Sequence, residues 1–220
     1  MRFGYRFWLY LARTIYTVLW WPRLQGREKL PEGAFLICPN HRSWFDPPMV
    51  AFLVPREIGF LAKAELFHNP LFGGLIRYLN ARPIRRGVID RTAEQEILRL
   101  LASGRPVLVF PEGTRSRTGR MQSPRPGVGR LARIAGLPIV PAYIEGNRRL
   151  SLAVFRWRRL TIRTGEPIPA EEVLAFPDDK DGYRALSRLI MQRICALSDD
   201  SARDLADAFP SDALVETHGS

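Results

Sequence analysis

Short apolar runs alternate with helical patterns along most of this chain, and this alternation constrains the fold more than any other feature. Candidate strands lie at residues 34–38, 58–62, 106–110, 138–144 and 159–164. Candidate helices lie at residues 46–53, 70–79, 91–103, 127–135 and 181–197. Most of the strands are continuously apolar, as expected where both faces of a sheet are covered. The pattern predicts an α/β fold, with a mostly parallel sheet flanked by helices in a single domain.

The first 24 residues differ in composition from the rest. They are rich in aromatic side chains, carry four arginines and contain no acidic residue. The apolar stretch from Phe7 is interrupted by Arg13 and ends at Pro22, so it is shorter than the ~20 residues of a spanning helix. Because aromatic rings favour the headgroup layer and arginines reach lipid phosphates, residues 1–24 are predicted to form an amphipathic helix in the membrane interface, on the cytoplasmic face. The alternative is a soluble helix packed on the core.

The remaining chain is expected to form one folded domain over residues 25–210 and a flexible tail over 211–220. The whole chain has a net charge of +11, and almost all of its basic residues are arginines. Such a charge suits anionic lipid, phosphorylated substrates or nucleic acid without distinguishing among them. Cys38 and Cys195 are the only cysteines, and each lies in an apolar stretch. They are typical of buried thiols in a reducing compartment. With only three histidines in the chain, no metal-binding pattern emerges.

The stretch NHRSWFDPP places His41 five residues before Asp46, which is followed by two prolines. Asp46 before Pro47 predicts a helix N-cap with proline at the first helical position. His41 then lies in the loop before this helix, where the chain can bring its imidazole back to the Asp46 carboxylate. The alternative is that Asp46 only caps the helix and His41 is an ordinary loop residue.

Further polar loops follow the candidate strands. In open α/β sheets, ligands bind beyond the carboxyl ends of the strands. The run at 106–110 leads into PEGTRSRTG, and six arginines but no acidic residue lie between Gly113 and Ile144. The loop ARPIRRG, residues 81–87, contributes further arginines at 82, 85 and 86. These segments predict an arginine-rich wall that binds phosphate oxygens.

A histidine, an orienting carboxylate and phosphate-binding arginines favour proton abstraction from a hydroxyl whose phosphate holds it in place. Ser43 and Cys38 are alternative nucleophiles. Ser43 does not lie in a G-x-S-x-G elbow, and Cys38 ends an apolar run, which favours a buried structural thiol. The GVGR sequence at 127–130 lacks the spacing of a phosphate-binding loop.

The ordered set NHRSWFD, FPEGTRS and PIVPAYI resembles the 1-acyl-glycerol-3-phosphate acyltransferases of phospholipid synthesis. His41 and Asp46 match the H-x4-D motif of that family, and residues 110–116 match its F-P-E-G-T-R-S block. The segment 60–77 and the Val-Pro pair at 140–141 extend the resemblance over roughly residues 30–168. The family's arginine motif is altered here, because PIRR has Pro83 at the apolar position and makes Arg86 the matching arginine.

The resemblance implies an O-acyltransferase that makes phosphatidic acid from lysophosphatidate at a bilayer. His41 would accept the proton of the lysophospholipid hydroxyl, which attacks an acyl thioester of coenzyme A or acyl carrier protein, while Asp46 orients the imidazole. The implied acceptor-binding residues are Arg86, Glu112, Gly113, Thr114 and Arg115. Of these, Arg115 would bind the phosphate, and Glu112 would hold an arginine or a glycerol hydroxyl. No metal, cofactor or nucleic acid is expected.

Several alternatives remain. The acceptor within the family could be glycerol-3-phosphate, another lysophospholipid or a lyso-aminolipid. From other classes, the chain could be a thioesterase or lipase that uses water, or a non-catalytic basic module that binds anionic lipid or nucleic acid. The nucleic-acid module is disfavoured because the aromatic residues cluster at the N-terminus instead of interleaving with the arginines.

Overall fold

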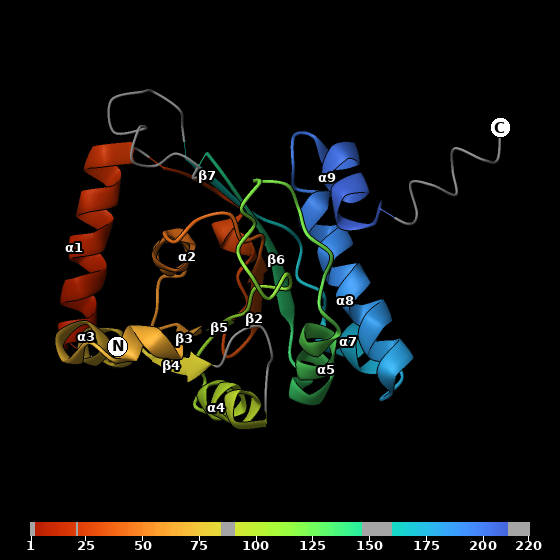
Figure 1. The fold of residues 1–220 in the computed structure, drawn as a ribbon, viewed down its shortest axis with the longest axis horizontal. Helices are drawn as coiled ribbons and strands as arrows, with labels where there is room; N and C mark the ends of the chain where they lie inside the picture. The colour runs from red at the N-terminus through yellow and green to blue at the C-terminus, as the bar shows by residue number, and fades with distance from the viewer. Residues whose placement is uncertain (1–2, 21, 85–90, 147–159, 211–220) are drawn as a thin grey trace.

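The computed structural model describes residues 3–20, 22–84, 91–146 and 160–210. In it the chain folds around a central sheet (Figure 1). Within these residues the sheet has seven strands in the order β1-β7-β6-β2-β5-β3-β4. The strands are β1 (Arg23–Gln25), β2 (Leu36–Pro39), β3 (Gly59–Lys63), β4 (Ala81–Ile84), β5 (Val107–Leu108), β6 (Ile139–Glu145) and β7 (Thr161–Thr164). Neighbouring strands are parallel except β6 and β7, which are antiparallel. The predicted α/β fold with a mostly parallel sheet is therefore confirmed.

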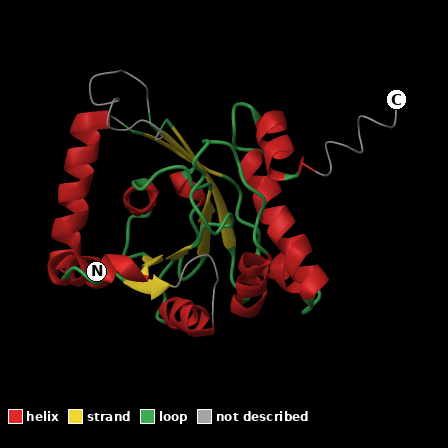
Figure 2. Cartoon of the chain, viewed as in Figure 1, coloured by secondary structure: helices red, strands yellow, loops and turns green. Residues whose placement is uncertain are grey.

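Helices cover both faces of this sheet (Figure 2). They are α1 (Phe3–Trp20), α2 (Asp46–Leu53), α3 (Pro70–Tyr78), α4 (Arg91–Ala102), α5 (Pro126–Ala135), α7 (Ala170–Ala175), α8 (Lys180–Cys195) and α9 (Ser201–Ala208), with short 3-10 helices at Arg27–Lys29 and Ala64–Phe67. In β2, Leu36 and Cys38 pack in the core under α4, α5 and α8. Ile37 and the preceding Phe35 pack on the opposite face, in the core with α2. This double coverage explains why the strands are continuously apolar.

Two short strands at the sheet edges differ from the prediction. β4 occupies residues 81–84, which were expected to be a loop, and among the described strands it pairs with β3 alone. Pro83 is compatible with an edge strand because its missing N–H breaks no hydrogen bond there. β1 pairs with β7 at the other edge, so the predicted boundary between residues 24 and 25 falls inside a strand. Neither strand has the long apolar run that marks the central ones.

The N-terminal helix α1 packs against α2 and presents an apolar face to the outside. Tyr5 and Leu9 are buried, and the hydroxyl of Tyr5 accepts the backbone N–H of Ile58 at 3.2 Å. Arg13 donates to the carbonyl of Phe52 at 3.1 Å. The exposed apolar side chains of α1 are Phe3, Phe7, Trp8, Tyr10, Leu11, Ile15 and Val18. Among the described residues, no helix combines the length and apolar character needed to cross a bilayer.

Candidate active site

The polar loops predicted from the sequence meet at one edge of the sheet. His41 follows β2, Glu112 follows β5, and Lys63 is the last residue of β3. Because these three strands are parallel, their carboxyl ends lie side by side, which is where α/β folds bind ligands. His41 and Lys63 line a cavity of about 1070 Å³ together with residues 113–118.

His41 and Asp46 form a hydrogen-bonded pair at this edge. The Nδ1 atom of His41 lies 2.7 Å from Oδ2 of Asp46, and the imidazole stacks on the ring of Phe110 with 3.8 Å between centroids. Asp46 is fully buried. Its Oδ2 atom also accepts the backbone N–H groups of Arg42 and Ser43, each at 2.8 Å. The carboxylate therefore holds both the imidazole and the loop that carries it.

The predicted N-cap role of Asp46 is wrong. Asp46 is the first residue of α2, the N-cap position belongs to Phe45, and no side chain caps the helix. The next two residues are prolines, which have no N–H to donate, and the N–H of Met49 bonds to the carbonyl of Phe45. The carboxylate of Asp46 therefore turns back to the preceding loop, where its donors lie.

The buried Asn40 anchors the start of this loop, a contact that the sequence analysis missed. Its side chain donates to the carbonyl of Ile144 at 3.0 Å and accepts the N–H of the same residue at 2.7 Å. The side-chain amide thus continues the pairing of β2 with β6. The only sequence signal was an asparagine two residues after the predicted strand at 34–38.

Glu112 connects the second loop to the first. Its Oε1 accepts the backbone N–H of His41 at 2.7 Å, and its Oε2 accepts from the side chain of Gln122 at 3.0 Å. In return, the N–H of Ser116 donates to the carbonyl of His41 at 2.8 Å. Burial raises the pKa of Glu112 to about 7. These contacts fix the histidine loop, and the contact of Glu112 with an arginine or a glycerol hydroxyl stays a prediction.

Arg115 lies on the ring of Trp44 at the cavity wall. Its guanidinium carbon is 4.2 Å from the ring centroid, and the ammonium nitrogen of Lys63 is 5.3 Å from the same centroid. Among the described residues, Arg115 forms no ion pair with a carboxylate, Glu112 included. Two cations therefore flank one aromatic ring in the cavity, an arrangement suited to an anionic group. Trp44 and Lys63 were not predicted as site residues.

The remaining predicted acceptor residues have different positions. Gly113 and Thr114 are exposed and line the cavity. Gly113 has φ 69°, and a side chain there would meet the Arg125 side chain, so this turn requires glycine. Arg86 and Arg85 lie outside the described residues.

The predicted arginine wall is wrong as a continuous surface. Of its six arginines, Arg115 and Arg117 line the cavity. Arg130 pairs with Glu94, and Arg133 donates to the carbonyl of Phe176. Arg82 in β4 pairs with Glu96, with 3.2 Å between Nε and Oε2. A run of arginines along the sequence therefore divides among cavity, helix surface and ion pairs, because α5 begins at residue 126 and turns its side chains in other directions.

Apolar side chains from α1, α2, β3 and α3 form much of the remaining cavity lining. They include Trp8, Leu9, Phe52, Phe60, Ile76 and Leu79. The N-terminal helix is thus a wall of the cavity that also contains His41, which the sequence analysis did not anticipate. The thiol of Cys38 is fully buried, and burial raises its pKa to about 12, so it remains a protonated structural thiol.

An imidazole held by a carboxylate can deprotonate a hydroxyl, and the adjoining apolar cavity can hold a long chain. These features suit the class of enzymes that transfer acyl chains to alcohols. The sequence model of the Acyltransferase family matches residues 22–145, so the chain belongs to the acyltransferase family and is an O-acyltransferase.

Individual relatives agree with this assignment. The chain is 28% identical over 214 residues to a 1-acyl-sn-glycerol-3-phosphate acyltransferase of Streptococcus pneumoniae, covering 93% of this chain and 78% of the relative. It is 37% identical over 147 residues to a lyso-ornithine lipid O-acyltransferase of Pseudomonas aeruginosa, covering 65% and 54%. The crystal structure of the 1-acyl-sn-glycerophosphate (LPA) acyltransferase of Thermotoga maritima superimposes with a TM-score of 0.68 at 26% identity, covering 88% of this chain and 79% of that one. The family resemblance predicted from the motifs is confirmed.

Proposed function

We propose that this protein transfers an acyl chain from a thioester to the free hydroxyl of 1-acyl-glycerol-3-phosphate, producing phosphatidic acid. The observation that carries the proposal is the hydrogen bond between His41 and Asp46, because His41 lines the same cavity as Arg115 and much of the remaining lining is apolar. The relatives named as 1-acyl-sn-glycerol-3-phosphate acyltransferases support the choice of acceptor.

In this mechanism, His41 is the general base. The carboxylate of Asp46 accepts the N–H of Nδ1, so Nε2 carries the lone pair that takes the proton of the acceptor hydroxyl. The alcohol oxygen attacks the thioester carbonyl, the C–S bond breaks, and the imidazolium returns its proton to the leaving thiolate. Asp46 stabilises the imidazolium between these steps. The acyl chain passes directly to the alcohol without an acyl-enzyme.

Arg115 is the proposed ligand of the acceptor phosphate. Its planar fork suits two phosphate oxygens, and its position on Trp44 keeps it at the wall of the cavity that contains His41. Gly113 and Thr114 border the same space and are proposed to contact the glycerol phosphate. Arg86 remains a proposed acceptor residue on the basis of its match to the family motif.

The acyl donor is proposed to be a thioester of coenzyme A or of acyl carrier protein, with no metal or other cofactor. The apolar lining from α1, α2 and α3 would hold an acyl chain. The exposed aromatic face of α1 would lie in the cytoplasmic interface of the bilayer, from which the lipid acceptor enters. Since Leu9 on the same helix lines the cavity, anchor and substrate site are continuous.

A second acceptor is favoured by one observation. The lyso-ornithine lipid O-acyltransferase of Pseudomonas aeruginosa has a higher identity than the Streptococcus relative, although over a shorter alignment. A lyso-ornithine lipid has no phosphate, so its use would not depend on a phosphate-binding arginine. The two acceptors are therefore distinguished by the response of each reaction to Arg115→Ala.

An acyl-transfer assay tests the proposal directly. The donors are acyl-CoA and acylated acyl carrier protein, the acceptors are lysophosphatidate and lyso-ornithine lipid, and mass spectrometry identifies the products. We expect phosphatidic acid as product and a loss of roughly 10²–10⁴-fold in His41→Ala, the usual contribution of a general base. The matched control is His68→Ala, which changes an exposed histidine outside the cavity lining. Wild-type activity in folded His41→Ala would refute the mechanism, and product from lyso-ornithine lipid alone would reassign the acceptor.

A further inference from the structure

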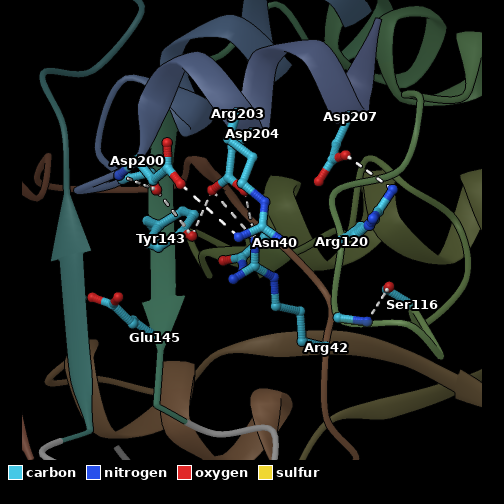
Figure 3. A network of polar contacts seen from close by, with 12 residues as sticks. Asn40, Arg42, Ser116, Arg120, Tyr143, Glu145, Asp200, Arg203, Asp204 and Asp207 are labelled. Atoms are coloured by element: carbon cyan, nitrogen blue, oxygen red, sulfur yellow. Dashed lines mark hydrogen bonds and ion pairs between the residues drawn. The ribbon is translucent and has the colours of Figure 1, made fainter. Parts of the chain in front are cut away.

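The side chain of Arg42 connects the histidine loop to the C-terminal helix α9. Arg42 lies between His41 and Asp46, and its backbone N–H donates to Oδ2 of Asp46 at 2.8 Å. Its guanidinium extends to Asp204 on α9, where Nη2 donates to both carboxylate oxygens at 3.1 and 3.3 Å (Figure 3). One residue therefore contacts the proposed catalytic carboxylate through its backbone and α9 through its side chain.

Asp204 lies in a buried polar network. It is 5% exposed, and it accepts the hydroxyl of Tyr143 at 2.6 Å. The hydroxyl of Ser198 donates to that of Tyr143 at 3.1 Å, and the guanidinium carbon of Arg42 is 5.2 Å from the centroid of the Tyr143 ring. Burial and the bond to Asp204 raise the pKa of Tyr143 to about 12, so the phenol keeps its proton and donates. The Tyr143 hydroxyl thus holds the Asp204 carboxylate, which makes this carboxylate a well-positioned partner for Arg42.

The same helix holds the second loop of the site. The hydroxyl of Ser123 donates to the carbonyl of Ala208 at 2.8 Å. The Nη1 atom of Arg120 lies 3.9 Å from Oδ1 of Asp207 (Figure 3). The two loops are joined to each other by the bond from Ser116 to the His41 carbonyl. Helix α9 therefore contacts both loops, and neither Asp204 nor Asp207 lines the cavity.

We propose that Asp204 is a positioning residue of the acyl transfer, through which α9 keeps His41 and Asp46 in reactive geometry. This inference rests on the proposed function of the His41–Asp46 pair. Helix α9 lies beyond residues 22–145, the part of the chain that matches the family model, so the motif residues depend on an element outside the matched region. Asp204 acts through Arg42 and touches no substrate. A misplacement of about 1 Å at a reacting group can reduce the rate 10²-fold.

Asp204→Asn tests this proposal because it keeps the shape of the side chain and removes the charge that binds Arg42. We expect kcat to fall about ten- to a hundredfold, with the KM values of acceptor and thioester nearly unchanged. Asp200→Asn is the matched control, since it makes the same change at the N-cap of α9, at an exposed carboxylate that does not contact the histidine loop. Tyr143→Phe removes one donor to Asp204 without removing the ring, and we expect a smaller fall in kcat.

Hydrogen exchange at residues 40–46 gives a second readout that does not require activity. In Asp204→Asn, the amides that bond to Asp46 and Glu112 should exchange faster than in wild type, whereas those in Asp200→Asn should not. If the wild type transferred no acyl chain, the proposed function would fail. Hydrogen exchange would then still test whether Asp204 holds the histidine loop through Arg42. Unchanged kcat and unchanged exchange in folded Asp204→Asn, or an equal loss in Asp200→Asn, would overturn the proposal. If Asp204→Asn did not fold, the same comparison on Tyr143→Phe decides.

Discussion

Replacing Asp46 with asparagine separates the charge of this residue from its shape. In the structure, a single carboxylate oxygen accepts from Nδ1 of His41 at 2.7 Å and from the backbone N–H groups of Arg42 and Ser43 at 2.8 Å. An asparagine oxygen in the same place still accepts all three bonds. The substitution therefore removes the negative charge while leaving the loop its acceptor.

The loss of stability can be worked from these three bonds. A hydrogen bond to a charged group contributes roughly 1.5–3 kcal/mol and a neutral one about 0.5–1.5 kcal/mol. Each of the three bonds should thus weaken by about 1 kcal/mol, which lowers the free energy of unfolding by about 3 kcal/mol. Because folded domains are usually stable by about 5–15 kcal/mol, we expect Asp46→Asn to remain folded.

The effect on rate should be larger than one weakened hydrogen bond implies. When His41 takes the hydroxyl proton, the imidazolium faces a carboxylate in the wild type and a neutral amide in the variant. Two unit charges about 4 Å apart attract by about 4 kcal/mol at an effective dielectric constant near 20. Since about 1.4 kcal/mol corresponds to a factor of ten, kcat should fall by about 10²–10³.

Steady-state kinetics with both substrates saturating, together with urea unfolding, measure the two effects separately. We expect lower kcat, little change in either KM and a moderate loss of stability. An exposed carboxylate such as Asp181 provides the control, and Asp181→Asn should change neither quantity. Wild-type kcat in an Asp46→Asn protein that has lost stability would show that Asp46 only supports the loop, and the catalytic role proposed for it would be refuted.

Three further predictions concern the acceptor, the pH dependence and the membrane. Arg115→Ala should raise the lysophosphatidate KM by about ten- to a hundredfold, since a hydrogen bond to a charged group contributes roughly 1.5–3 kcal/mol. The KM of Arg115→Lys should lie between those of wild type and Arg115→Ala. An unchanged acceptor KM would exclude Arg115 as the phosphate ligand. Burial raises the pKa of Glu112 from 4.5 to about 7, so the folded state retains a proton over this interval and stability falls as pH rises through it. Urea unfolding at pH 5 and pH 7 should show that Glu112→Gln loses this dependence, which amounts to roughly 2 kcal/mol between these two pH values. An equal slope in both proteins would contradict the assignment. Phe3 and Phe7 are exposed on α1. Replacing both with serine should weaken binding to anionic vesicles in a sedimentation assay, by roughly 1.5–3 kcal/mol for each ring that the bilayer buries, without lowering the melting temperature. Undiminished sedimentation would place the membrane anchor elsewhere.

The fold class and the position of the site could be predicted from the sequence because both depend on local patterns. Continuous apolar runs marked the central strands, and the predicted helix at 46–53 agrees with α2. The short edge strands β1 and β4 were missed because pairing on one side alone requires no long apolar run. A helix N-cap, in contrast, depends on which backbone N–H groups are free to donate. The two prolines after Asp46 have none, so the predicted N-cap role of Asp46 was wrong.

Contacts between distant residues were decided by the tertiary structure alone. Glu112 bonds to the backbone of His41 across 71 residues, and Arg42 bonds to Asp204 across 162 residues. The sequence identified Glu112 and Arg115 as neighbours in a motif, but only the fold turned one towards the histidine loop and the other onto Trp44. Likewise, composition marked residues 1–24 as unusual, and packing made α1 a wall of the cavity. Periodicity and motif spacing act over a few residues and determine the elements, whereas the direction and partner of each polar side chain depend on which elements the hydrophobic core brings together.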